Sequence, residues 1–255
     1  MTKKADQIVS RLGIQSWCFR GLKGGQESII QALRECDVHN LELCGIHLNP
    51  VEAGKAALSQ ALAQYAGAGV AISAYGTHGF YDNADEARKV FEFAALASFP
   101  SITGDAWPGS KWIEVVESLC AEYGKKIAVH NHGRKHWFGP VMALEDLFQR
   151  TSPHVGLCLD TGWMLDSGEN PLEVARKFRD RLYGVHMKDF VFDRAGKPED
   201  VVTGTGNLDL DGLASFLVEM DFDGYLSIEF EGDVDNPVPA LKRCVEAIRA
   251  SFAKV

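Results

Sequence analysis

The sequence of 255 residues contains no apolar run long enough to cross a membrane. Its most apolar window, residues 91–99, includes Glu92 and is far shorter than the roughly 20 residues that a membrane-spanning helix needs. The N-terminal residues also lack the continuous apolar segment of a signal peptide. From these absences we expect a soluble protein of the cytoplasm that has no membrane partner.

Positive charge is scarce: 26 Lys and Arg stand against 35 Asp and Glu, which gives a net charge of −9. A surface that follows nucleic-acid phosphates needs clustered Lys and Arg. We therefore expect a small-molecule partner and no nucleic acid. The six cysteines include no C-x-x-C pair, and such scattered residues in a long chain are typical of reduced, buried thiols.

Short apolar runs alternate with longer amphipathic stretches along the whole chain. The runs predict eight strands, at residues 13–16, 40–44, 70–75, 101–103, 127–131, 155–160, 182–187 and 225–230. The amphipathic stretches predict eight helices, at residues 26–36, 51–65, 85–98, 111–123, 142–150, 171–178, 210–220 and 238–252.

Eight strand–helix repeats favour a parallel sheet, and a chain of this length suits a single (β/α)8 TIM barrel spanning residues 1–255. The alternative, a doubly wound open sheet, usually carries G-x-G-x-x-G after its first strand, and no such motif follows residues 13–16. The segment 190–207 is rich in glycine and contains a proline, so we expect a loop over the mouth of the barrel.

Barrel enzymes form their active sites at the carboxyl ends of the strands. Barrel interiors are normally filled by Val, Ile and Leu, so a gathering of ligand-type side chains at these ends needs a cause. The predicted strand ends carry Glu42, His78, His130, His132, Asp160, His186, Lys188, Asp189, Glu229 and Glu231.

The fifth predicted strand ends in His130-Asn131-His132. Residues two apart share one face of a strand, so both histidines are expected to point into the barrel and Asn131 outward or into the loop. Two hydrogen-bonded histidines are one reading, and a metal ligand is the other, because neutral imidazole is the commonest metal ligand. Which of the two histidines would bind the metal stays open.

Three further strand ends carry candidate ligands. Asp160 ends a buried strand, where a carboxylate must be paired, bound to a metal or used to cap a turn. His186 and Lys188 share a face of the seventh strand by the same period of two. Glu229 and Glu231 share a face of the eighth, and we expect Glu231 to lie on the rim.

The segments H-N-H-G, L-D-T-G-W, V-H-M-K-D and L-S-I-E-F-E-G, at residues 130–133, 159–163, 185–189 and 226–232, carry a recognisable pattern. Together with the strand at residue 13, the chain resembles the xylose-isomerase-like barrel superfamily of sugar isomerases, sugar-phosphate isomerases and epimerases. The resemblance covers nearly the whole chain and implies the (β/α)8 fold.

The resemblance also implies one divalent metal ion held by residues of strands five to eight. Asp160, His186 and Glu229 match three of the family's ligands. His130 stands where many members have a glutamate, although a subset of the superfamily also reads His-Asn-His. A set of two imidazoles and two carboxylates favours Mn²⁺ or Zn²⁺, with Co²⁺, Fe²⁺ or Mg²⁺ as further candidates.

In the ketose epimerases of this superfamily, two metal-bound glutamates act as opposed acid and base. His130 replaces one of them here, so Glu229 would work with His132, His130 or Lys188. The resemblance implies an isomerase or epimerase that moves a proton on a keto-sugar or related polyol through a metal-stabilised enediolate. A lyase or dehydratase of the inosose type, or an enzyme that cleaves 3-keto-glycosides, is the alternative.

We expect Glu229 to be the catalytic base and His132 the second acid or base, since the pKa of histidine suits proton transfer near neutrality. Lys188 would stabilise developing oxyanion charge or bind a substrate hydroxyl. The substrate itself would be bound by His78, Trp17, Trp107 and Trp163, although ordinary packing explains each tryptophan equally well.

Two readings from other classes remain. A phosphodiesterase resembling the endonuclease IV branch would need three zinc ions and a basic face, which eight histidines and an acidic balance disfavour. A non-catalytic sugar-binding barrel is the other. The segment 204–206 offers a possible phosphate-binding nest, so sugar and sugar phosphate both stay open. If the chain assembles, we expect a homo-oligomer of closed symmetry.

Overall fold

The computed structural model describes residues 2–106 and 111–255. Eight parallel strands close into a barrel in the order β1-β10-β7-β6-β5-β4-β3-β2, which confirms the predicted (β/α)8 fold. The barrel strands are β1 (Leu12–Gln15), β2 (Asn40–Leu43), β3 (Ala71–Phe80), β4 (Ser101–Ala106), β5 (Lys126–His130), β6 (Val155–Asp160), β7 (Leu182–Met187) and β10 (Tyr225–Ile228).

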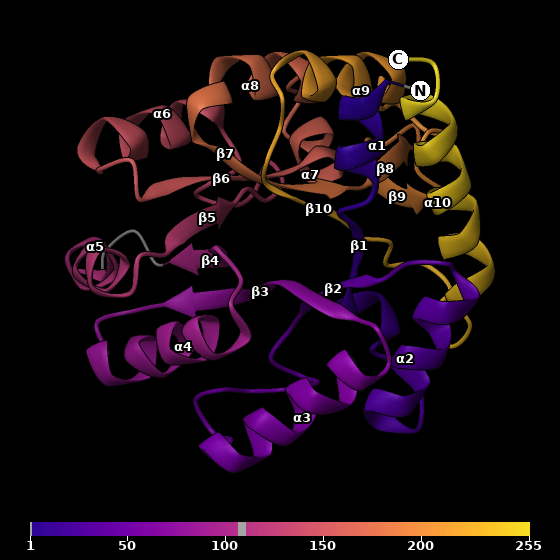
Figure 1. The fold of residues 1–255 in the computed structure, drawn as a ribbon. Helices are drawn as coiled ribbons and strands as arrows, with labels where there is room; N and C mark the ends of the chain where they lie inside the picture. The colour runs from indigo at the N-terminus through magenta and orange to yellow at the C-terminus, as the bar shows by residue number, and fades with distance from the viewer. Residues whose placement is uncertain (1, 107–110) are drawn as a thin grey trace.

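A ring of α-helices surrounds these strands (Figure 1). The helices are α1 (Lys3–Val9), α2 (Gly25–Glu35), α3 (Lys55–Gly67), α4 (Ala84–Ala97), α5 (Trp112–Tyr123), α6 (Val141–Arg150), α7 (Thr161–Asp166), α8 (Pro171–Lys177), α9 (Leu210–Glu219) and α10 (Val238–Phe252). Two short 3-10 turns, Ser16–Phe19 and Arg179–Arg181, complete the helical elements. Helices α1 and α7 have no counterpart among the predicted elements.

The third helix begins later than residue 51, where the apolar spacing places its start. The side chain of Asn49 accepts a hydrogen bond from the Val51 N–H, and its carbonyl accepts from the Glu52 and Ala53 N–H groups. These bonds close a separate turn in front of the helix, which then starts at Lys55. Polar turn residues therefore overrode the apolar periodicity at this point.

The segment expected to be a loop over the barrel mouth is partly a β-hairpin. Strand β8 (Asp189–Phe192) pairs antiparallel with β9 (Pro198–Val201), from Asp189 opposite Val201 to Phe192 opposite Pro198. Asp193 turns the chain between them, because its side chain accepts hydrogen bonds from the N–H groups of Ala195 and Lys197. The expectation of a plain loop was wrong, since glycine and proline here mark a tight turn.

The register of the parallel strands brings their carboxyl ends to one level. Asp160 lies beside His186, His130 beside Cys158, and Ser227 beside His186. Buried apolar side chains of strands and helices form the main core, with Leu157, Val185 and Ile228 each fully shielded from solvent. The polar side chains of the strand ends therefore sit together on top of an apolar interior.

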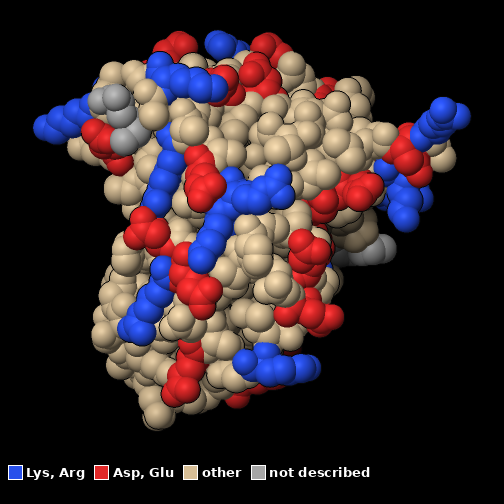
Figure 2. All heavy atoms as spheres, turned by 90° about the vertical axis from the view of Figure 1, so that its right-hand side faces the viewer, with Lys and Arg blue, Asp and Glu red and all other residues tan. Residues whose placement is uncertain are grey.

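Surface charge is mixed on the face that Figure 2 presents, which is the right-hand side of Figure 1: acidic and basic side chains alternate there. Within residues 2–106 and 111–255, every helix is either too short or too polar to span a bilayer.

Candidate metal centre

Four of the side chains that were predicted at the strand ends lie together at the barrel mouth. His130, Asp160, His186 and Glu229 each offer one ligand atom, and these atoms all lie within 4.8 Å of one another. They come from the ends of β5, β6 and β7 and from the residue that follows β10. His130 is 2% exposed, Asp160 and His186 are completely buried, and the side chain of Glu229 is 12% exposed.

Three buried atoms of this cluster have no hydrogen-bond partner: Nδ1 and Nε2 of His130, and Oδ2 of Asp160. His130 Nε2 lies 3.4 Å from Asp160 Oδ2 and 3.6 Å from Glu229 Oε2, beyond ordinary N–H···O distances. Ligands held about 2.0–2.2 Å from a shared ion lie at roughly this separation from one another. Because unpaired buried polar atoms are costly, the cluster fits a divalent metal ion that would satisfy them.

His130, and not His132, faces this cluster. His132 Nε2 lies 3.5 Å from Oδ2 of Asp105, and Nε2 of His136 lies 3.4 Å from the same oxygen. The Phe138 N–H donates to His136 Nδ1, so a neutral His136 carries its proton on Nε2, toward Asp105. Burial lowers the pKa of His132, although Asp105 opposes this effect.

Asp160 caps a helix, which is one of the roles that its position allowed. Its Oδ1 accepts a hydrogen bond of 2.8 Å from the Trp163 N–H and caps helix α7, while Oδ2 faces His130. Asn131 fixes this geometry: its amide donates to the Asp160 carbonyl and accepts from the Asp160 N–H, at 3.0 and 2.8 Å. Asn131, which was expected to point outward or into the loop, is fully buried and ties β5 to β6.

His186 is held between two carboxylates. Its Nδ1 lies 2.8 Å from Glu229 Oε2, and its Nε2 lies 2.8 Å from Glu42 Oε2. Glu42 is fully buried on β2 and also accepts a hydrogen bond from the Thr103 hydroxyl. A neutral His186 that donates Nε2–H to Glu42 leaves Nδ1 free to bind a metal. The sequence showed Glu42 at a strand end but offered no sign that its partner lies across the barrel.

Replacing Glu42 by glutamine is expected to weaken metal affinity about 10- to 100-fold, the usual effect of losing the group that orients a ligand histidine. The amide no longer fixes the proton of His186 on Nε2. Titration of the metal-free protein with Zn²⁺ or Mn²⁺ measures the change, and the exposed Glu52→Gln is the matched control. Equal affinities for both variants and the unsubstituted protein would show that Glu42 is only structural.

A buried cation lies beside the cluster. Lys188 Nζ lies 2.5 Å from Glu231 Oε1 and 3.3 Å from Asp200 Oδ2 on the β8–β9 hairpin. Burial alone would lower the pKa of Lys188, but Glu229, Asp160 and the two paired carboxylates hold it well above its ordinary value. These carboxylates favour the charged form of Lys188, which suits the role of a cation.

The charged side chains of the cluster shift one another's pKa values. Burial alone would lower the pKa of His130, but Asp160 and Glu229 raise it to about 10. Burial also disfavours the ionised form of Glu229, yet Lys188 and His186 hold the pKa of Glu229 well below its ordinary value. A proton on His130 must leave before a metal can bind there, so metal affinity should fall as the pH is lowered.

A cavity of about 440 Å³ opens above the cluster. Among its walls are Trp17, His130, His132, Trp163 and Glu229, together with Glu231. Glu231 Oε2 accepts a hydrogen bond from the indole N–H of Trp17, and its side chain is 32% exposed, on the rim as expected. Two of the predicted substrate contacts, Trp17 and Trp163, therefore border the space over the candidate metal centre.

His78, a third predicted contact, does not border this space. His78 packs edge-on against Phe80 and lines a separate small cavity with Asn83 and Glu86. Burial lowers the pKa of His78 to about 4. The strand was expected to end at residue 75, but β3 continues to Phe80 with a register shift between Tyr75 and His78, which moves His78 away from the mouth. Trp107 lies outside the described residues.

The possible phosphate nest at residues 204–206 is filled from within. Both carboxylate oxygens of the fully buried Asp189 accept backbone hydrogen bonds, at 2.8–2.9 Å, from the N–H groups of Gly204, Gly206, Asn207 and Leu208. The segment does form an anion-binding nest of backbone N–H groups, but the anion that fills it is the carboxylate of Asp189. A substrate phosphate therefore has no place in it.

Sequence comparison matches residues 103–251 to the family described as "Xylose isomerase-like TIM barrel". Inosose dehydratase of Geobacillus kaustophilus is 30% identical over 166 residues, which are 54% of this chain and 52% of that protein. The chain thus spans about half the length of the curated relatives that it matches.

Two solved structures share the fold. The IOLI protein, described with a binding zinc atom, has a TM-score of 0.75 at 16% identity and covers 95% of this chain and 98% of its own. The probable 3-DHS dehydratase AsbF of Bacillus anthracis has a TM-score of 0.74 at 15% identity, covering 93% and 98%. At these identities the likeness shows the barrel alone.

Proposed function

This chain belongs to the family of xylose isomerase-like TIM barrels, and we propose that it is a divalent-metal-dependent enzyme that removes a proton beside the carbonyl group of a polyhydroxylated ketone. The observation that carries this proposal is the set of unpaired buried atoms of His130 and Asp160, which face the carboxylate of Glu229 at the floor of an open cavity. Without an ion, the burial of these unpaired polar atoms costs free energy. With an ion, the same atoms would hold a Lewis acid beside the substrate.

The ion would be held by His130, Asp160, His186 and Glu229. When bound, it would act as a Lewis acid on the substrate carbonyl. The mixed nitrogen and oxygen ligands favour Zn²⁺ or Mn²⁺ over Mg²⁺, which prefers oxygen.

Glu229 is the most exposed member of this set at the substrate space. Its side chain is 12% exposed and lines the cavity, whereas His130 is only 2% exposed and Asp160 and His186 are shielded from solvent. A carboxylate so placed can accept the proton from the carbon beside the carbonyl. Lys188 places a positive charge beside the cluster, and a cation there would favour the negative charge that this step creates.

His132 supplies a second, chemically different group. Its side chain is 29% exposed, lines the same cavity and lies against Asp105. A neutral imidazole has one N–H donor and one free nitrogen, so His132 can bind a substrate hydroxyl. Its protonated form, supported by Asp105, can give that hydroxyl a proton. One carboxylate and one imidazole form an unequal pair, unlike the two equal groups that epimerisation uses on opposite faces.

An unequal pair suits elimination of water: Glu229 takes the proton and His132 protonates the departing hydroxyl. The curated relatives described as inosose dehydratases support this choice. A keto-sugar or keto-polyol is therefore the proposed substrate class. Isomerisation is the second candidate, since one carboxylate, that of Glu229, is enough to move a proton between neighbouring carbons on one face.

Mass-resolved analysis of products separates these candidates. The metal-loaded protein is incubated with a panel of inososes, keto-sugars and 3-keto-glycosides. Dehydration lowers the substrate mass by one water, cleavage of a glycoside releases the aglycone, and isomerisation leaves the mass unchanged while the retention time shifts. We expect loss of water from an inosose-type ketone. Turnover of no member of the panel by protein with a full complement of metal would contradict the proposal.

A further inference from the structure

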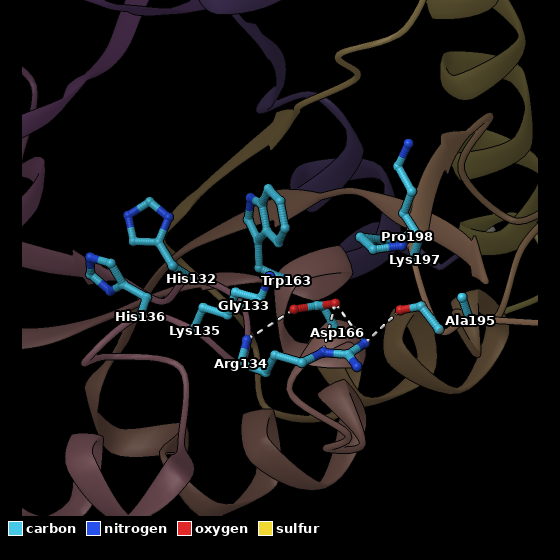
Figure 3. Close-up of a pocket in the computed structure, with 11 residues that line it drawn as sticks. His132, Gly133, Arg134, Lys135, His136, Trp163, Asp166, Ala195, Lys197 and Pro198 are labelled. Atoms are coloured by element: carbon cyan, nitrogen blue, oxygen red, sulfur yellow. Dashed lines mark hydrogen bonds and ion pairs between the residues drawn. The ribbon is translucent and has the colours of Figure 1, made fainter. Parts of the chain in front are cut away.

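A second cavity adjoins the one above the candidate metal centre. Its volume is about 630 Å³, within the usual size of ligand sites, and it shares the walls His132 and Trp163 with the first cavity. Figure 3 shows Trp163 between the two histidines, His132 and His136, and the hairpin residues Lys197 and Pro198. A substrate bound at Glu229 can extend past Trp163 into this space.

The walls of the second cavity are basic. Arg134, Lys135 and Lys197 line it, and its one acidic wall residue, Asp166, is already bound by Arg134. Among the described residues, the side chains of Lys135 and Lys197 form no ion pair. In a chain with a net charge of −9, two lysines that line one cavity form a local positive site, although Asp193 lies near enough to Lys197 to interact with its charge.

The floor of this cavity is rigidly built. The carboxylate of Asp166, only 8% exposed, accepts hydrogen bonds from the backbone N–H and the guanidinium of Arg134. The same guanidinium donates to the carbonyl of Gly196 at 3.0 Å, which ties the β8–β9 turn to the end of β5 (Figure 3). The two lysines are thus carried on segments that are fixed to each other before any ligand arrives.

We propose that this second cavity binds an anionic group of the substrate, a carboxylate or a phosphate, between Lys135 and Lys197. The inference rests on the proposed function, because it places the reacting end of the same molecule at Glu229. The backbone nest at residues 204–206 is closed to such a group by Asp189, which leaves the two lysines as the available recognition site.

Three polyols of equal chain length test this inference: glucitol, gluconate and glucitol 6-phosphate. Calorimetry measures their affinities for the unsubstituted protein and for the double variant Lys135→Met/Lys197→Met, which keeps the side-chain stems. Lys242→Met, on the exposed side of α10, is the control. Arg134 is left in place because its removal would release Asp166 and the hairpin turn.

We expect the anionic polyols to bind about tenfold more tightly than glucitol at low salt, and the advantage to vanish in the double variant but not in the control. An advantage of gluconate alone assigns a carboxylate, and one of glucitol 6-phosphate alone assigns a phosphate. No anionic advantage, or one that survives in the double variant, overturns the inference.

Each affinity is measured with metal-free and with metal-loaded protein. A lysine-dependent advantage that persists without metal belongs to the second cavity, whereas one that needs the metal belongs to the ion itself and counts against the inference. If the protein takes up no metal at all, the proposed function fails, while the metal-free measurements still decide whether the lysines select anions.

Discussion

Glu229→Gln should lower turnover about a thousandfold, the order of magnitude that general acid–base catalysis supplies. Glutamine has the size of glutamate but can accept no proton from the substrate. The wild-type side chain lies 2.8 Å from His186 Nδ1 and 3.6 Å from His130 Nε2, and it lines the cavity. The rate constant kcat of metal-loaded protein measures the loss, and circular dichroism checks the fold.

Loss of the metal would also abolish activity in this variant, so its metal content must be measured. His132→Gln provides the complementary test, since His132 lies outside the four-ligand set and should keep the metal while losing kcat. The exposed Glu219→Gln, at the end of α9, should behave as wild type. Turnover that survives in Glu229→Gln at full metal occupancy would remove Glu229 from the chemistry.

The second large effect is expected on stability. Metal at about 100 times its dissociation constant stabilises a folded protein by about 2.7 kcal/mol. For a chain of this size that corresponds to an increase in Tm of roughly 5–10 °C. Saturation of the unpaired atoms of His130 and Asp160 is the physical reason. Thermal unfolding of metal-free protein, with and without Zn²⁺ or Mn²⁺, gives the shift directly.

Asp160→Asn is the sharpest variant for this measurement. Asparagine is as good a helix cap as aspartate, so the bond from the Trp163 N–H to Oδ1 can persist and α7 should stay folded. The other oxygen, which faces His130, becomes an amide that cannot bind a cation. We expect the metal-dependent increase in Tm to disappear in Asp160→Asn and to persist in Asp105→Asn, which alters the neighbouring histidine pair. An undiminished shift in Asp160→Asn would place the ion elsewhere.

The barrel and the four clustered side chains could be predicted because both follow from local rules. A period of two places His130 on the inner face of β5, and parallel register aligns Asp160 with His186 at the next strand ends. The family resemblance added the choice of ligands. Their gathering within 4.8 Å agrees with that prediction, while metal binding itself stays a proposal.

Contacts across the barrel could not be predicted. Glu42 meets His186 only because the sheet closes and brings β2 within reach of β7, with β1 and β10 between them. The role of Asn131 depends on the backbone of β6, which lies 29 positions later in the chain. His78 was misplaced for a different reason: an irregularity inside β3 changes the direction of side chains beyond Tyr75, and apolar alternation carries no signal of such a shift.

The adjacent residues Lys188 and Asp189 carry opposite charges, and their side chains lie in different surroundings. The lysine ends among carboxylates, and the aspartate ends among four backbone N–H groups. A slip of the chain by one residue at the end of β7 would drive the cation toward N–H donors and the anion toward acidic side chains. The lysine would then repel the N–H groups and the aspartate would repel the acidic side chains. This pair of residues therefore disfavours a shifted strand register as the barrel closes.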